Sequence, residues 1–394
     1  YPQTYFLLVH NLDLNLQEWN PIGLYGSSDA NSYAFAGNFE GNGKTIKKMS
    51  ITDAASVYAG LFGNVDGGAT ICNLHVDSSY IDIASTEASN SSAGLIAGQS
   101  AATISNCSAS GRVEGSFHTA GGLVGYVRLT MQNCTGNVDV VNMSGYAGGI
   151  AGSGMVSDII NCHTYADSIV GKNAGGIIAN SNSGEIRSCT NAAIVKAEAM
   201  AGGIVAQLSG STFGSSMERC ANSGTVIGED AGGIAGLPVS SINDCFNAGM
   251  VQGSMNAGGI AAMSNSDGNK ISSCYNIGEI NVSSAYGTKG ELIATFQYGN
   301  VTNSYFDKQM KPHATAFGTR TGNASFALLT TQFVDSLPDN FDTAAWQHES
   351  GRYPLIKGLP LSRGMDLQTA ALKLHVSNDS LYDTPGRIRR DMGI

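Results

Sequence analysis

The sequence predicts an all-β fold, a right-handed parallel β-helix of about nine coils with end caps. Three observations lead to this prediction. Cysteines recur in one register at intervals of 25 to 31 residues, and a Gly-[Leu/Ile]-x-[Gly/Ala] motif recurs out of phase with them. No repeat unit contains an amphipathic helical pattern of about ten residues. A fixed period of about 20–50 residues is typical of a solenoid or a related array.

The cysteine register predicts a buried column. Leu74 and Ser304 continue the register at its two ends, and between them it holds Cys107, Cys134, Cys162, Cys189, Cys220, Cys245 and Cys274. Equivalent residues on stacked parallel strands lie about 4.8 Å apart. Their side chains point the same way, whereas a disulfide needs them to point toward each other. We therefore expect free thiols that pack as small apolar groups. Cys72 lies two positions out of register.

The glycine motif predicts close approach of neighbouring backbones. It begins at Gly60, Gly94, Gly122, Gly149, Gly176, Gly203, Gly233 and Gly259. Glycine could permit close backbone approach or leave room for a ligand. Because the glycine recurs in every coil while a ligand site needs only one, the structural explanation is favoured. The third motif position is apolar throughout, at Phe62, Ile96, Val124, Ala151, Ile178, Val205, Ala235 and Ala261. This column is either core or an exposed apolar stripe for a partner.

Each coil offers three short extended stretches with a corner before the cysteine. An apolar residue such as Ile104 stands three positions before each column residue, so the two cannot share a face of one regular strand. Asn106, Asn133, Asn161 and Asn303 directly precede the column. Asparagine tolerates the left-handed conformation. We expect a left-handed corner there, with stacked asparagines bonding to each other. Crossovers between parallel strands are almost always right-handed, which gives the predicted hand.

Ordered motifs near the start carry a family resemblance. They read W-x-P-I-G at 19–23, F-x-G-x-F-x-G-N-G-x-T-I at 35–46, G-L-F-G at 60–63 and I-x-N-L at 71–74. Over roughly residues 5–358 the chain resembles the GLUG-repeat family. Such repeats occur in large bacterial surface proteins, including adhesin-like proteins and the non-catalytic regions of immunoglobulin-A-specific metallopeptidases. The resemblance implies a β-helical, secreted or cell-surface module and no particular ligand.

The repeat boundaries predict four parts of the chain. Residues 1–58 form an N-terminal cap and first coil, and residues 59–305 form the GLUG-repeat β-helix. Residues 306–358 form a C-terminal capping segment, in which residues 323–338 are expected to form a short capping helix, because an open coil end exposes unpaired backbone. Residues 359–394 are a tail or the start of a following domain. The chain opens on Tyr1-Pro2, which indicates a processed or excised piece.

The net charge and the lack of a basic run bear on which classes of partner are expected. The chain has 21 Lys and Arg against 31 Asp and Glu, a net charge of -10, and no basic run within the repeats. Nucleic acid is therefore not an expected partner. No run of about 18 apolar residues predicts a membrane span. The oligomeric state stays open.

Catalytic and metal motifs are not expected. The nearest approach to H-E-x-x-H is the run 348–352, which reads HESGR and lacks the second histidine. The other histidines show no metal spacing, so neither a cofactor nor a catalytic residue is predicted. Carboxylates for an alternative enzyme reading are Glu114, Asp139, Glu198, Glu229 and Asp230. Aromatics that could stack on sugar rings are Tyr25, Tyr33, Phe35, Phe117, Tyr126 and Phe213.

These patterns favour a non-catalytic bacterial cell-surface or secreted β-helix for adhesion or ligand binding, with host glycoprotein or polysaccharide as candidate partners. One alternative is a polysaccharide-active lyase or glycosidase. The other is the non-catalytic region of a surface metallopeptidase. The sequence does not separate binding from a spacing role.

Overall fold

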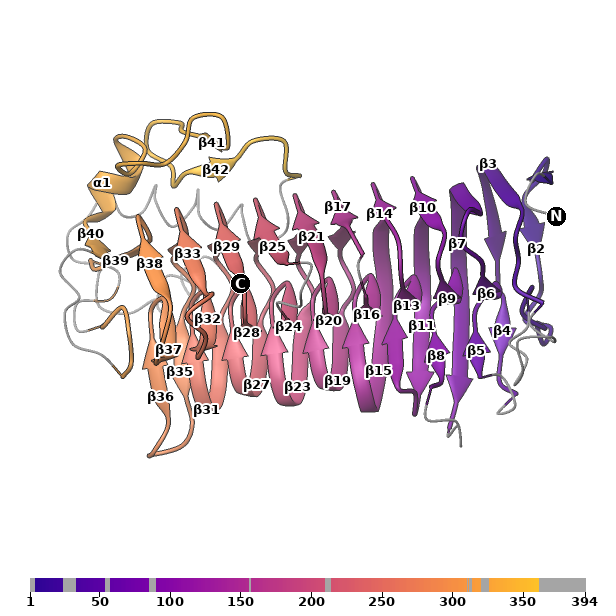
Figure 1. The fold of residues 1–394 in the computed structure, drawn as a ribbon, viewed down its shortest axis with the longest axis horizontal. Helices are drawn as coiled ribbons and strands as arrows, with labels where there is room; N and C mark the ends of the chain where they lie inside the picture. Colours follow the sequence, from indigo (N-terminus) through magenta and orange to yellow (C-terminus); the bar gives the residue numbers. More distant parts are fainter. Residues whose placement is uncertain are drawn as a thin grey trace, which may run out of the picture.

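The computed structural model describes residues 4–23, 33–53, 57–84, 90–155, 157–209, 214–309, 311, 314–319 and 326–360. These residues form a rod of stacked, nearly identical β-coils that runs from the N-terminal coil to a short helix at the other end (Figure 1). Among them, every strand pair is parallel except β41 (Trp346–Gln347) with β42 (Leu355–Ile356). The predicted all-β parallel solenoid is confirmed, and its right hand stays a prediction.

One wall of the rod, here called the motif sheet, carries the glycine motifs. It has nine strands: β6 (Phe62–Val65), β9 (Ala97–Ser100), β13 (Val124–Val127), β16 (Ala151–Gly154), β20 (Ile178–Ser181), β24 (Val205–Leu208), β28 (Ala235–Pro238), β32 (Ala261–Ser264) and β37 (Ile293–Phe296). Single bridges from Ile22 to Phe62 and from Ile293 to Phe317 extend this sheet at its two ends. Its strands agree with the predicted number of about nine coils.

The remaining walls belong to one continuous 31-stranded sheet. Before the cysteine corner lie β10 (Thr103–Ser105), β14 (Met131–Gln132), β17 (Ile159–Ile160), β21 (Gly184–Arg187), β25 (Ser215–Glu218), β29 (Ser241–Asn243), β33 (Lys270–Ser272) and β38 (Asn300–Thr302). After it lie β18 (His163–Thr164), β22 (Thr190–Asn191), β26 (Ala221–Asn222), β30 (Phe246–Asn247), β34 (Tyr275–Asn276), β39 (Tyr305–Asp307) and β40 (Ala327–Leu328).

The third stretch of each coil leads to the next glycine motif. It comprises β7 (Thr70–Ile83), β11 (Ser108–Gly115), β15 (Thr135–Gly148), β19 (Ser168–Gly175), β23 (Ile194–Gly202), β27 (Val226–Gly232), β31 (Val251–Gly258), β35 (Ile280–Val282) and β36 (Thr288–Gly290). The short strands β8 (Ser92–Ala93) and β12 (Thr119–Gly121) also precede motifs. The N-terminal coils contribute β1 (Tyr5–Leu7), β2 (Leu12–Asp13), β3 (Asn38–Lys47), β4 (Ser50–Ile51) and β5 (Tyr58–Ala59).

The core is one continuous apolar column along the rod. All eight residues at the third motif position, from Phe62 to Ala261, are fully buried within it. Of the two readings left open by the sequence, the core reading is therefore correct, and this column is not a partner surface.

The predicted left-handed corner is confirmed in every described coil from Asn73 to Asn303. The backbone φ angle at the residue before the column lies between 47° and 57° at Asn73, Asn106, Asn133, Asn161, Ser188, Arg219, Asp244, Ser273 and Asn303. The predicted bonds between stacked asparagines are also present. The Nδ2 of Asn106 donates to Asn73, that of Asn133 to Asn106 and that of Asn161 to Asn133, at 3.2, 3.0 and 2.8 Å.

A second asparagine ladder, missed at the sequence level, lies inside the rod. Asn191, Asn222, Asn247 and Asn276 stand two residues after a column cysteine and are fully buried. Each Nδ2 donates to the Oδ1 of the next member, at 2.9, 2.8 and 2.9 Å. Each asparagine also bonds the backbone two residues ahead of it. The ladder thus satisfies buried polar groups that would otherwise be costly.

The motif glycines make room for the backbone of the next coil and for this ladder. A Cβ at any of the eight would lie 2.0–2.6 Å from a carbonyl oxygen of the following coil. At Gly176, Gly203, Gly233 and Gly259 it would also lie 2.4–2.5 Å from the Cγ of a ladder asparagine. Such distances are far inside van der Waals contact, so only glycine fits.

The C-terminal part of the chain folds back along the rod. We call residues 326–360 the flank segment. It contains α1 (Thr330–Val334), β41 and β42, which lie beside the coils that carry β25 to β38 (Figure 1). Phe246, Tyr275 and Tyr305 stand one residue after the column and pack outside the core against Phe333, Phe341, Trp346 and Tyr353. The helix lies within the predicted 323–338, and the four-part division of the chain stays a prediction.

Several polar contacts hold the flank segment to the coils. The Nε1 of Trp346 donates to Asp244 at 2.8 Å, and the hydroxyl of Tyr275 donates to the carbonyl oxygen of Pro354 at 2.6 Å. The buried carboxylate of Asp307 accepts hydrogen bonds from Thr330 and Tyr353 at 2.6 and 2.5 Å. Burial, followed by the Asp307 charge, raises the pKa of Tyr353 well above its usual value.

Replacing Gly203 by alanine tests the close approach of the coils. The new Cβ would lie 2.0 Å from the Gly233 oxygen and 2.5 Å from Asn222 Cγ. We expect the free energy of unfolding to fall by about 2–3 kcal/mol, measured by circular dichroism in urea. The control is Gly67→Ala, where a Cβ meets nothing within 4 Å. A Gly203→Ala variant as stable as the control would contradict the expectation.

Replacing Asn222 by alanine tests the inner ladder. The change removes bonds to Asn191, Asn247 and the backbone of Gly224, so that each of these buried groups loses a hydrogen-bond partner. We expect a loss of about 3 kcal/mol or more in urea unfolding. The matched control is Asn137→Ala, at an exposed position of β15, with an expected change of less than about 0.5 kcal/mol. Equal losses in the two variants would argue against a stabilising ladder.

Candidate binding face

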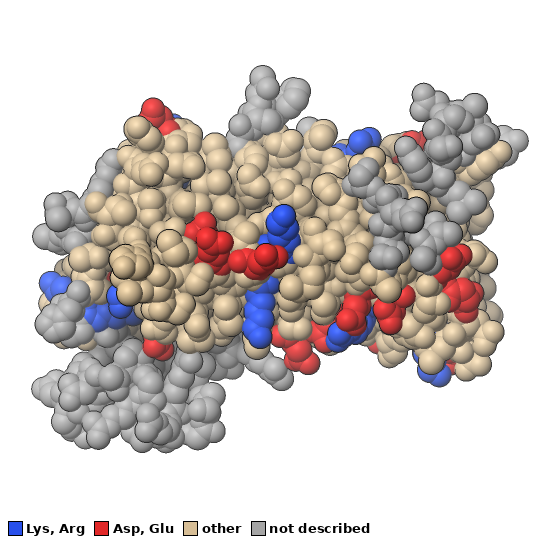
Figure 2. Space-filling model, turned by 90° about the horizontal axis from the view of Figure 1, so that it is seen from below, with Lys and Arg blue, Asp and Glu red and all other residues tan. Residues whose placement is uncertain are grey.

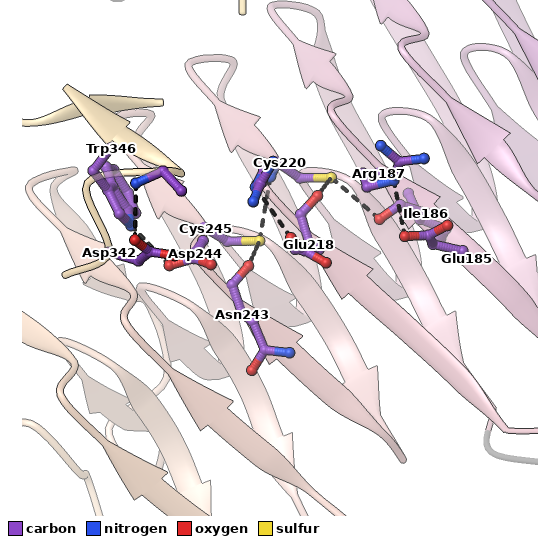
Figure 3. A network of polar contacts seen from close by, with 12 residues as sticks. Glu185, Ile186, Arg187, Glu218, Cys220, Asn243, Asp244, Cys245, Asp342 and Trp346 are labelled. Atoms are coloured by element: carbon purple, nitrogen blue, oxygen red, sulfur yellow. Dashed lines mark hydrogen bonds and ion pairs between the residues drawn. The ribbon is translucent and has the colours of Figure 1, made fainter. Parts of the chain in front are cut away.

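The cysteine column lies inside the rod and is closed to ligands. All eight cysteines are free, and the seven in register are at most 2% exposed. Each of the seven thiols donates to the carbonyl oxygen two residues earlier, at 3.1–3.4 Å, as Figure 3 shows for Cys220 and Cys245. Leu74 and Ser304 are also buried, and the Ser304 hydroxyl makes the equivalent bond to Thr302. Burial raises the pKa of the Cys162, Cys220 and Cys245 thiols.

The carboxylates singled out in the sequence do not form one group. Glu198 and Glu229 are exposed. Asp139 accepts the backbone N–H of Ser168 at 2.9 Å, and Asp230 accepts the side chain of Asn256 at 2.6 Å. Within the described part of the chain, no group of three or more His, Cys, Asp or Glu side chains is placed to hold a metal ion.

Glu114 has the most charged surroundings of these carboxylates. It pairs with Arg112 at 2.6 Å, and it lies directly beside Asp82 in the parallel register of β7 and β11. Arg112 in turn lies beside Asp139 of β15. The hydrogen bond to Glu114, helped by the charges of Glu114, Asp139 and Asp82, raises the pKa of the Arg112 guanidinium. About half of the Arg112 side chain is exposed, so this group sits on an open surface.

The aromatic candidates divide into core and surface residues. Phe117 is buried. Phe35 packs against the core, and its ring contacts the rings of Phe6 and Phe62 in a tilted arrangement. Tyr33 is exposed near the N-terminal end, and Tyr126 is half-buried on the motif sheet. Tyr25 and Phe213 lie outside the described residues, as do residues 361–394 of the predicted tail.

Tyr126 belongs to a row of polar side chains on the outside of the motif sheet. In the parallel register, neighbouring strands align Gln99, Tyr126, Ser153, Asn180 and Gln207, which we call the amide row. Adjacent members lie about 4.8 Å apart, so the row is about 20 Å long. Only one of its members, Ser153, is buried, and Asn180 donates to its hydroxyl at 3.3 Å. The other amides keep donors and acceptors for an external partner.

The turn that follows the amide row adds a cation and apolar surface. The guanidinium carbon of Arg128 lies 5.6 Å from the ring centre of Tyr126, within cation–π range. Leu129 and Met155, in the turns after β13 and β16, are 40% and 44% exposed. An aromatic ring with an arginine beside it therefore lies within the row of amides, and two exposed apolar side chains follow in the adjoining turns. No signal in the sequence alone placed them together, because they come from five separate coils.

Charge is sparse on the rod. Figure 2 shows a face on which acidic and basic side chains lie near one another among uncharged residues. This face therefore provides no extended field of one sign to steer a highly charged partner. Where the chain is described, none of its helices has the length and apolar character to cross a bilayer.

Comparison with known proteins identifies the repeat unit. The family model described as "The GLUG motif" matches residues 89–114. This chain carries the GLUG motif. The matched range runs from the strand before Gly94, through β9, the corner and Cys107, into β11, so one GLUG match corresponds to about one coil of the rod.

Two similar proteins were found. A 115-residue stretch is 34% identical to Halomucin of Haloquadratum walsbyi. It makes up 28% of this chain and 1% of Halomucin, so the GLUG chain spans a very small part of that protein. A solved "putative immunoglobulin A1 protease" from Bacteroides ovatus aligns with a TM-score of 0.41 and 17% identity, over 90% of this chain and 86% of that one. Similarity at this level assigns no activity.

Thiol labelling tests the closed column of the GLUG rod. Cys72 is partly exposed, and burial followed by its hydrogen bond to Glu40 raises its pKa to about 11. In the folded chain, iodoacetamide should modify Cys72 alone. Because the thiolate reacts, the rate should rise about tenfold per pH unit toward that pKa. In denaturant all eight cysteines should react.

Mass spectrometry of the labelled protein reads the number and the site of modification, and Cys72→Ser is the control that should stay unlabelled while folded. Labelling of any column cysteine in the native Cys72→Ser variant would show that the rod interior is open.

Proposed function

We propose that this chain is a non-catalytic, extracellular bacterial β-helix module that binds glycan chains through the motif sheet. The observation that carries the proposal is the amide row with Tyr126, Arg128, Leu129 and Met155 beside it. This surface combines an aromatic face with several side-chain amides. The GLUG repeat supports the extracellular location, because this chain resembles a repeat family that occurs in bacterial surface proteins.

The chemistry of the row suits an uncharged, hydroxyl-rich partner. Glutamine and asparagine amides each offer two donors and an acceptor, which matches the mixed hydrogen bonding of sugar hydroxyls. The Tyr126 ring supplies an apolar face and is held by Arg128. A spacing of about 4.8 Å between neighbouring side chains suits a linear chain that meets several polar groups in a line. Binding by several weak contacts in a line then adds up through multivalency.

A retention assay tests this function. The labelled chain is incubated with mucin, matrix proteins, immunoglobulin A, and plant and bacterial polysaccharides, and both bound protein and released product are measured. We expect retention on at least one glycan-bearing surface without product. Tyr126→Ala should weaken retention about tenfold or more, because aromatic anchors carry much of such binding energy.

The matched control is Tyr165→Ala, which removes an exposed tyrosine that follows β18, away from the motif sheet. Its retention should equal that of the unchanged chain. Equal retention by the Tyr126→Ala, Arg128→Ala and unchanged proteins would rule out the amide row as the binding face. Retention on none of the surfaces would leave the spacing role as the better description.

A polysaccharide-active enzyme is the second candidate, favoured by Asp82, Glu114 and Arg112 on neighbouring strands. Two carboxylates close together are what glycoside cleavage requires. Release of product that disappears in Glu114→Gln and persists in Glu198→Gln would establish this reading in place of the first. Immunoglobulin A bound without cleavage would instead suit the non-catalytic region of a surface metallopeptidase.

A further inference from the structure

The inner asparagine ladder ends in a group of reactive side chains. In the coil that contains β37, Glu291 stands where the earlier coils have the first glycine of the motif, directly before Leu292. The position after Asn276 in the ladder is Phe306, so no further asparagine follows. Glu291 takes the place of the missing member and accepts the Nδ2 of Asn276 at 3.0 Å. The repeat is therefore broken at this end by a buried carboxylate.

Lys311 reaches the same place from the segment after β39. Its Nζ donates to Glu291 Oε2 at 2.5 Å and to the carbonyl oxygen of Gly278. The Nδ2 of Asn276 donates to these same two oxygens, at 3.0 and 3.2 Å. The amine and the amide nitrogen are thus neighbours that share both acceptors. The three side chains are almost closed to water: Lys311 and Glu291 are 11% and 7% exposed, and Asn276 is fully buried.

We propose that Lys311 and Asn276 form an isopeptide bond within the folded chain, with Glu291 carrying the protons. The Lys311 ammonium first gives a proton to the Glu291 carboxylate. The free amine then forms a bond from Nζ to Cγ of Asn276, and the Cγ–Nδ2 bond breaks. The products are a secondary amide and one ammonium ion, so atoms and charge balance and no oxidant or cofactor is required.

Each group occupies the position that its step needs. Glu291 Oε2 touches both the nitrogen that attacks and the nitrogen that leaves, so one carboxyl group can move a proton from Nζ to Nδ2. The backbone N–H of Gly278 donates to Oδ1 of Asn276 at 3.1 Å, where negative charge develops in the tetrahedral intermediate. Folding holds the reactants together, which replaces an encounter in solution by a unimolecular step.

The other rungs of the ladder provide an internal comparison. Asn222 and Asn247 make the same backbone bonds and donate to the next asparagine instead of a carboxylate. In the described structure, neither has a lysine amine against it. The reaction is therefore assigned to Asn276 alone. The bond would tie the segment that leads to the flank segment to the coil of β34, at the end of the rod where the repeat stops.

Intact-protein mass spectrometry tests the bond. After overnight incubation at neutral pH, the unchanged chain should weigh less than its sequence by one ammonia molecule. A tryptic digest should contain one linked pair of peptides that joins Lys311 to Asn276. Lys311→Arg and Glu291→Gln should keep the full sequence mass. Lys289→Arg, which changes an exposed lysine of β36, should lose ammonia like the unchanged chain.

Circular dichroism of the variants checks that each one folds, and the mass of the unchanged chain decides the matter even if a variant does not. A full sequence mass for the unchanged chain overturns the proposal. Loss of ammonia that persists in Lys311→Arg also overturns it, because an asparagine would then have cyclised on its own backbone. The test is independent of glycan binding, which the Tyr126→Ala assay measures at the other wall of the rod.

Discussion

The spacing of about 4.8 Å between consecutive coils is the constraint on which this structure depends. Every residue of a coil must fit against its own equivalent one coil away. Glycine is required where a Cβ would clash with the carbonyl oxygen of the neighbouring coil. Cysteine or a similarly small side chain fits where equivalent side chains stack directly on one another in the core. Asparagine solves the polar part of the same problem, because one amide both donates to and accepts from its equivalents. The resulting rod gains its stability from neighbouring coils, as repeat proteins do.

The places where the repetition fails are therefore the informative ones. After Cys220 the position following the column changes from polar to apolar and aromatic, through Ala221, Phe246, Tyr275 and Tyr305, and there the flank segment covers the coils. At Glu291 the motif glycine is lost and a buried ion pair with Lys311 takes its place. On the motif sheet Tyr126 interrupts a line of amides and hydroxyls. A uniform coil offers the same surface everywhere, so a specific partner needs such departures.

The side chains on these surfaces also favour a binding role over a catalytic one. Thiols that are buried and bonded to backbone carbonyls contribute packing and not reactivity. Carboxylates spread over several strands, either exposed or hydrogen-bonded to separate donors, resemble surface charge more than an acid–base pair, apart from Asp82 and Glu114. A surface of amides with one aromatic ring suits recognition without chemistry. Covalent closure at Lys311 would suit a module that must keep its shape outside the cell.

The sequence by itself determined the fold class, the number of coils within about one, and the left-handed corners, because these follow from periods and from residues such as Asn106 that tolerate the left-handed conformation. Tertiary structure decided which apolar column faces inward, that Asn222 and its equivalents form an inner ladder, and that Trp346 reaches Asp244 over a separation of 102 residues. The amide row and the Glu291 group also needed the fold. Neighbours in the amide row are about one coil apart in the chain, and Glu291 lies 15 and 20 residues from Asn276 and Lys311, so only folding brings these residues together.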